Sequence, residues 1–138
     1  MWLKRITVIL ILLLVAFVFW FGTGFLYDPH GMAVGFGLPK SAVPSGDVNA
    51  FLNVKGVRDV VTGLIPLVLL LTRQIKALAW VLLTTALIPI GDATIIFSYG
   101  GDPATAIGVH LATATYLVVT SLLCFTIASR AKKRSVEA

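Results

Sequence analysis

Long apolar stretches separated by short polar segments dominate the chain. Residues 6–26 contain no charged side chain, 77–97 contain only Asp92, and 104–129 have His110 as their only Asp, Glu, Lys, Arg or His. A helix needs about 20 apolar residues to cross a bilayer, because every backbone N–H and C=O must be bonded within the segment. The pattern therefore predicts membrane spans at about 6–26, 77–97 and 104–129.

A fourth span requires a backward extension of a shorter apolar run. The neutral run 60–72 is too short to cross alone, but it becomes long enough if the helix begins near residue 48, with Ser45 or Asp47 as N-cap. Three charged residues then enter at or below the headgroup level: Lys55, Arg58 and Asp59. We predict an all-α four-helix transmembrane bundle, forming one integral membrane domain over 1–138.

Composition supports a membrane protein. Hydrophobic residues make up 58% of the chain and charged residues 12%, which excludes an ordinary water-soluble domain. The formal charge of +5 could indicate nucleic-acid binding, but the positive residues flank the apolar runs. We therefore expect the lipid bilayer as partner and no nucleic acid.

The positive residues also predict the orientation, because Lys and Arg near span ends favour the cytoplasmic side. Most of the 11 lie on one side of a four-span chain: Lys4, Arg5, Arg73, Lys76, Arg130, Lys132, Lys133 and Arg134. Both termini, including the tail 130–138, are thus predicted to be cytoplasmic, with loop 27–47 outside. The first span resembles a signal peptide, but its bulky aromatic residues and missing small-residue cleavage site favour an uncleaved anchor.

The loop 27–47 is rich in Gly and Pro, a composition that favours turns. Apolar residues alternate with small ones at Met32, Val34, Phe36 and Leu38. This piece could lie against the membrane surface, fold over the mouth of the bundle, or serve as a simple connector.

Four ionisable residues are predicted to share one depth in the membrane. Arg58 and Asp59 lie near the outer end of the second span, and at 1.5 Å per residue Asp92 and His110 lie roughly 10 Å below the outer surface. Ionisable groups inside a bilayer need partners. We predict an outer-side polar cluster of Arg58, Asp59, Asp92 and His110, with Arg58 facing Asp92 as a charge-assisted pair.

The same polar contacts could serve only to fix helix register. Pro66 and Pro89 each remove a backbone hydrogen bond, so kinks there would widen the outer half of the bundle. The spacing of Ala104, Gly108 and Ala112 predicts a small-residue face for close helix approach.

Other chemistry has little support in the sequence. The lone Cys124 excludes an intrachain disulfide framework. Asp28 and His30 could be drawn with Asp92 and His110 as a metal site, but they lack helical ligand spacing, so we expect neither metal nor cofactor. No phosphate-binding loop or nucleophile elbow is present.

Several short motifs resemble one known family. They are the run 36–39 (Phe-Gly-Leu-Pro), the run 54–59 followed by Gly63, Pro89 to Asp92, and His110 with Tyr116. Together they resemble domain of unknown function 4267, a family of small four-span membrane proteins, and more distantly compact families of the DoxX type. The resemblance implies no assigned activity, but Arg58, Asp59, Asp92 and His110 match the polar pattern of the family.

Two functional hypotheses follow. The first is a non-catalytic membrane protein whose polar cluster binds a small amphiphilic molecule or a partner. The second is a membrane-embedded isomerase, cyclase or hydrolase for a lipophilic substrate, with Asp92 and His110 as acid and base and Arg58 as anion stabiliser. A homo-oligomer is compatible with the sequence, whereas a transporter is disfavoured because one four-helix unit holds no inverted repeat.

Overall fold

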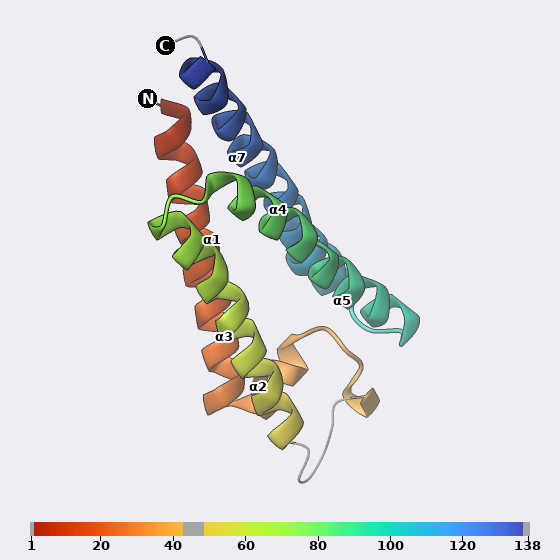
Figure 1. Cartoon of the computed structure of the whole chain (residues 1–138). Coiled ribbons are helices and arrows are strands. Elements are labelled where there is room, and N and C mark those ends of the chain that lie inside the picture. The colour runs from red at the N-terminus through yellow and green to blue at the C-terminus, as the bar shows by residue number, and fades with distance from the viewer. Residues whose placement is uncertain (1, 43–48, 137–138) are drawn as a thin grey trace.

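The computed structural model describes residues 2–42 and 49–136 of the chain. The predicted N-caps Ser45 and Asp47 lie outside these residues. All regular secondary structure of the described part is helical, which confirms the all-α prediction (Figure 1). Its elements are α1 (Trp2–Tyr27), α2 (Pro29–Gly35), a 3-10 turn η1 (Lys40–Ala42), α3 (Asn49–Leu71), α4 (Ile75–Thr85), α5 (Leu87–Ser98), α6 (Pro103–Thr105), a π-helix η2 (Ala106–Leu111) and α7 (Ala112–Val136).

Three helical segments of the described chain are long and apolar enough to cross a membrane: Trp2–Tyr27, Ile75–Ser98 and Pro103–Lys133. They correspond to the predicted spans 6–26, 77–97 and 104–129. Helix α3 occupies the predicted range 48–72 almost fully, but it carries three charged residues and is not among these segments. The chain is thus a helical protein with three candidate membrane spans.

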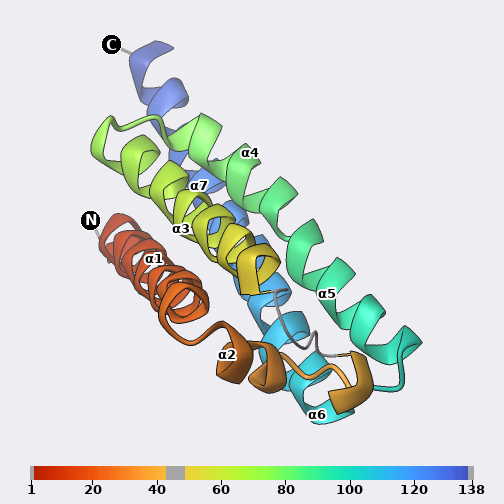
Figure 2. The same ribbon diagram turned by 90° about the horizontal axis from the view of Figure 1, so that it is seen from below.

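The long helices form two pairs. Helix α3 runs along α1, while α4 and α5 run along η2 and α7, and the pairs diverge toward the end that carries α2 (Figures 1 and 2). The start of α1 and the end of α7 lie toward the opposite end of the molecule (Figure 1). Tyr116 of α7 joins the pairs by donating a hydrogen bond to the Leu10 carbonyl at 2.8 Å.

Glycines allow α1 and α3 to approach closely. A Cβ on Gly56 would lie 2.7 Å from the carbonyl oxygen of Gly22, and one on Gly22 would lie 2.8 Å from the Val60 nitrogen. The small-residue face predicted at Ala104, Gly108 and Ala112 is wrong as a packing surface within the chain. These residues are exposed, and no atom lies within 4 Å of a Cβ built on Gly108.

The two prolines affect their helices differently. The helical segment Ile75–Ser98 is interrupted at Ala86, three residues before Pro89, as expected for a residue without an N–H to donate. Helix α3, in contrast, continues through Pro66, whose ring is buried. Pro89 therefore interrupts the helical segment one turn before Asp92.

Of the segment between α1 and α3, the described residues 28–42 lie across the ends of the long helices near the polar residues, with α2 packed against α1 and α3 (Figure 2). After α2, Gly37 adopts φ +100°, and its carbonyl accepts a hydrogen bond from the Asp102 amide at 2.8 Å. Asp102 in turn caps α6. Hydrogen bonds from the Thr105 hydroxyl, and to a smaller extent from the amides of Thr105 and Ala104, lower the pKa of the Asp102 carboxyl. The carboxylate therefore still caps α6 at a pH below the usual pKa range of an aspartate.

We predict that Gly56→Ala destabilises the fold. Its methyl group would collide with the Gly22 carbonyl, forcing α1 and α3 apart at a cost of about 1–3 kcal/mol. Thermal unfolding in detergent micelles should show a lower Tm. Gly91→Ala is the matched control, because no atom lies within 4 Å of its added Cβ and alanine favours the helix. Equal Tm values for the two variants would contradict this account of α1–α3 packing.

Candidate functional site

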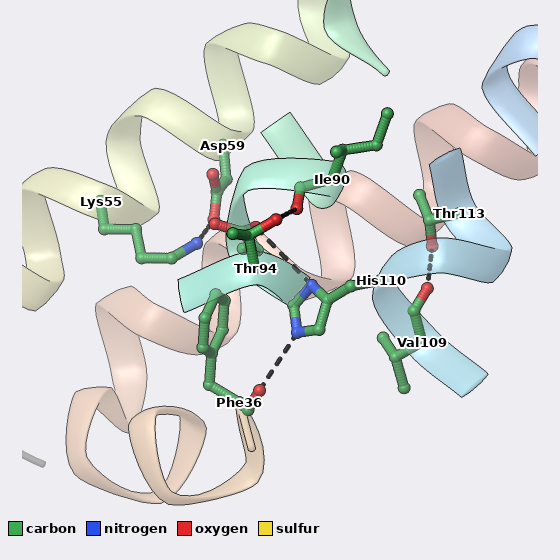
Figure 3. Close-up of polar contacts among 9 residues, drawn as sticks. Phe36, Lys55, Asp59, Ile90, Thr94, Val109, His110 and Thr113 are labelled. Carbon is green, nitrogen blue, oxygen red and sulfur yellow. Dashed lines mark hydrogen bonds and ion pairs between the residues drawn. The ribbon is translucent and has the colours of Figure 1, made fainter. Parts of the chain in front are cut away.

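His110 lies at the centre of the polar site and comes from the π-helix η2. Its side chain is buried, and Nε2 lies 3.1 Å from the carbonyl oxygen of Phe36, beyond the end of α2 (Figure 3). A carbonyl oxygen only accepts, so Nε2 carries the hydrogen and donates it. Single π-helical turns are rare and are frequent at functional sites.

Asp92 of α5 faces the other nitrogen of the same ring. Its Oδ2 lies 3.6 Å from His110 Nδ1. When the imidazole is neutral and its hydrogen is on Nε2, Nδ1 holds a lone pair, as does the carboxylate oxygen. The two atoms therefore attract each other only while one further proton resides on the imidazole or on the carboxyl. The predicted proximity of Asp92 and His110 is confirmed.

Lys55 and Asp59 of α3 complete the cluster. Lys55 Nζ lies 2.6 Å from Asp59 Oδ2, one helical turn away. The ammonium also lies 4.6, 5.0 and 5.1 Å from the ring centres of Phe25, Phe36 and Phe21, within the range of cation–π attraction. Both Lys55 and Asp59 interact electrostatically with Asp92, so α3 and α5 contribute to one site.

The predicted Arg58–Asp92 pair is wrong. Arg58 is exposed, and the ion pairs of the described residues do not include it. Successive helical residues point about 100° apart, and the face of α3 toward the cluster carries Lys55 and Asp59. Lys55, and not Arg58, supplies the positive charge of the cluster. Its i,i+4 spacing to Asp59 is the sequence signal that could have found it.

A partly open cavity of about 90 Å³ adjoins this cluster. It lies between α1, α3, the α4–α5 segment and η2–α7, with mainly apolar walls. Lys55, Asp59, Asp92 and His110 all contribute to its lining. The Lys55, Asp59 and Asp92 side chains keep 31%, 20% and 25% of their surface exposed, so the polar end is not sealed.

Three threonines add hydroxyls to the cavity lining. Thr62 donates to the Arg58 carbonyl and Thr113 to the Val109 carbonyl. Thr85 lines the cavity just before the Ala86 interruption, and its hydroxyl has no hydrogen bond to another described residue. A hydroxyl in this position can bond to a molecule in the cavity.

Of the two other candidate metal ligands, His30 is exposed on α2 and Asp28 caps that helix. Asp28 precedes α2 and accepts a hydrogen bond from the Gly31 amide at 2.9 Å. Within residues 2–42 and 49–136, His, Cys, Asp and Glu side chains form no group of three or more suited to a metal ion.

We predict that Asp92→Asn preserves stability and Asp92→Ala does not. The carboxamide introduced by Asp92→Asn can donate to His110 Nδ1, as a protonated carboxyl does. Asp92→Ala leaves this buried nitrogen without a partner, at a cost of about 1–3 kcal/mol. Unfolding midpoints in micelles measure the difference. Equal losses in both variants would show that Nδ1 needs no donor.

Comparison with known proteins identifies a family for the chain but no function. No curated protein and no solved structure matches it. The sequence profile named Domain of unknown function (DUF4267) matches residues 15–124, which include Lys55, Asp59, Asp92 and His110. This match covers most of the chain, and the protein therefore belongs to the family of domain of unknown function 4267.

Proposed function

We propose that the protein crosses the membrane four times and binds a small amphiphilic molecule in the cavity between its helices. The polar group of that molecule would lie against Lys55, Asp59, Asp92 and His110. The observation that carries the proposal is a largely apolar cavity with a polar cluster in its lining. Ligand sites in proteins commonly combine apolar walls with a few convergent polar groups.

The exposed face of α3 supports its role as the fourth span. At 1.5 Å per residue its 23 residues extend about 34 Å, enough to cross the hydrocarbon core. Its exposed side chains are almost all apolar, including Val57, Val61, Leu64 and Val68. Lys55 and Asp59 neutralise each other inside the bundle, and the long side chain of Arg58 can reach the headgroups.

The positions of the basic residues support cytoplasmic termini. Lys4 and Arg5 lie at the start of α1, and Arg130 lies in the last part of α7, at the same end of the molecule. Arg73 and Lys76 flank the start of α4, on the side away from α2. This is the distribution that the positive-inside rule associates with the cytoplasm.

The polar cluster supports recognition of a ligand rather than a purely structural role. Lys55, Asp59 and Asp92 each keep part of their side chain accessible, so they retain capacity for further hydrogen bonds. Thr85 offers another hydroxyl donor within the same cavity. A cluster that served only to fix helix register would need none of this unused capacity.

A membrane enzyme is the second candidate, and one observation favours it. Asp92 and His110 form a pair that requires one proton for mutual attraction, and His110 lies on a π-helical turn. Such a pair can accept and release protons as general acid–base catalysts do. Lys55, rather than the exposed Arg58, would then stabilise a developing negative charge.

We predict opposite membrane sides for Ser41 and Lys76. In a background with Cys124→Ala, a membrane-impermeant thiol reagent should label Ser41→Cys in intact cells or spheroplasts. It should label Lys76→Cys only after permeabilisation. Both positions are exposed, so accessibility within the fold does not limit labelling. Labelling of both from the outside would show that α3 does not cross the membrane.

We predict that loss of the Lys55–Asp59 pair weakens binding at the polar end. The probe is hexadecanol with a diazirine beside its hydroxyl, applied to protein in phosphatidylcholine vesicles. Wild type should show labelling that excess hexadecanol suppresses. The double variant Lys55→Gln/Asp59→Asn removes both charges together and should reduce this labelling at least fivefold.

Arg58→Gln is the matched control, because it removes a charge from the exposed face of the same helix. It should label like wild type. Equal labelling of the double variant and the control, with both folded by helicity and gel filtration, would overturn the proposed site.

A further inference from the structure

A groove of about 390 Å³ lies beside the cavity, between α1 and the η2–α7 helix. Leu14, Phe17, Val109 and Thr113 line both hollows, so the groove and the cavity share a wall. Gly108 borders the groove and is exposed, and a Cβ added to it would have no other atom within 4 Å. The groove therefore adjoins the cavity, and it opens to the side of the helices.

The two hollows differ in the part of a molecule they can hold. The cavity of about 90 Å³ is large enough for a polar group and a few neighbouring atoms, because a single water needs roughly 10–15 Å³ by this kind of measure. The groove of about 390 Å³ falls in the range of roughly 300–1,000 Å³ that ligand pockets occupy. An amphiphile with its polar end in the cavity thus has space for its body in the groove.

The chemistry of the groove suits a hydrocarbon chain. Its two hydroxyl-bearing residues are already bonded within the protein: Tyr116 donates to the Leu10 carbonyl and Thr113 to the Val109 carbonyl. The rest of the lining is aliphatic or aromatic, apart from Gly108. Contact between such an apolar surface and a hydrocarbon chain is favourable, whereas a charged group would find no partner there.

The charges around the cavity suit an uncharged polar group. Lys55 and Asp59 of α3 cancel, and Asp92 of α5 with His110 of η2 sum to zero when they hold their one proton. α1 contributes only aromatic rings to this end, and α2 is followed by the Phe36 carbonyl. A net charge on the ligand would remain uncompensated in a low-dielectric site, which is costly.

We infer that the ligand is an uncharged amphiphile with one long hydrocarbon chain, such as a long-chain alcohol, which reaches the site sideways from the bilayer. Its chain lies in the groove between α1 and α7, and its polar group lies at the cluster. The inference rests on the proposed function and specifies its ligand class. A second copy of the chain, packed on the exposed Gly108 face, is the competing occupant.

Hexadecanol with a diazirine at the far end of its chain tests the groove, in phosphatidylcholine vesicles. Mass spectrometry should locate the label within 13–17 and 108–116, and excess hexadecanol should suppress it. Gly108→Trp fills the groove and should reduce this labelling at least fivefold. Gly91→Trp is the matched control, since its helical glycine also faces open space, and should label like wild type.

Permanently charged analogues test the polar end. Hexadecyl sulfate and hexadecyltrimethylammonium should compete at least tenfold less effectively than hexadecanol. Equal competition by either ion, or equal labelling of Gly108→Trp and Gly91→Trp, would overturn the inference. A Gly108→Trp protein that changes from oligomer to monomer without losing label would assign the groove to a second copy instead.

The two hexadecanol probes separate this inference from the proposed function. In one outcome, excess hexadecanol suppresses labelling by the probe with the diazirine near the hydroxyl, but Gly108→Trp does not change labelling by the chain-end probe. This result would refute the groove and retain the cavity site. Absence of suppressible labelling by both probes would refute both.

Discussion

Charges placed between apolar helices must be neutralised by neighbouring groups, because hydrocarbon and packed side chains cannot solvate them. This constraint explains how the polar side chains are arranged near the end of the molecule that carries α2. Lys55 pairs with Asp59 within one helix, and Asp92 pairs with His110 between two segments. The aromatic rings around Lys55 and the carbonyl bonded to His110 complete the environment. The cavity lies beside these groups, and residues of both helix pairs line it.

Most of the helical architecture could be predicted from the sequence, because long apolar runs have few alternatives to a helix in a bilayer. The spans predicted at 6–26, 77–97 and 104–129 correspond to candidate membrane segments. The depth of Asp92 and His110 followed from counting residues along a helix, and the two side chains do meet. Whether α3 is a membrane span was less predictable, because hydropathy alone cannot distinguish paired charges from exposed ones.

Side-chain direction was harder to predict than depth. Arg58 was assigned to the cluster, whereas Lys55 occupies that place, because the rotation of α3 is fixed by glycines that contact α1. This contact depends on tertiary packing and has no local pattern. The π-helical turn that carries His110 could not be predicted either, because no periodic sequence pattern indicates such a turn. The bond from His110 to the Phe36 backbone joins residues 74 positions apart and involves no side chain of Phe36.

The local nature of the Lys55–Asp59 pair has a consequence for how the chain is made. Both residues lie on one helical turn, so their charges can cancel as soon as α3 forms, before α5 or η2 has been synthesised. His110 is synthesised much later, so its hydrogen bond to the Phe36 carbonyl can form only after η2 has been synthesised. During synthesis the charges of Lys55 and Asp59 thus cancel within α3 itself, whereas the end of the molecule that carries α2 closes only when η2 is in place.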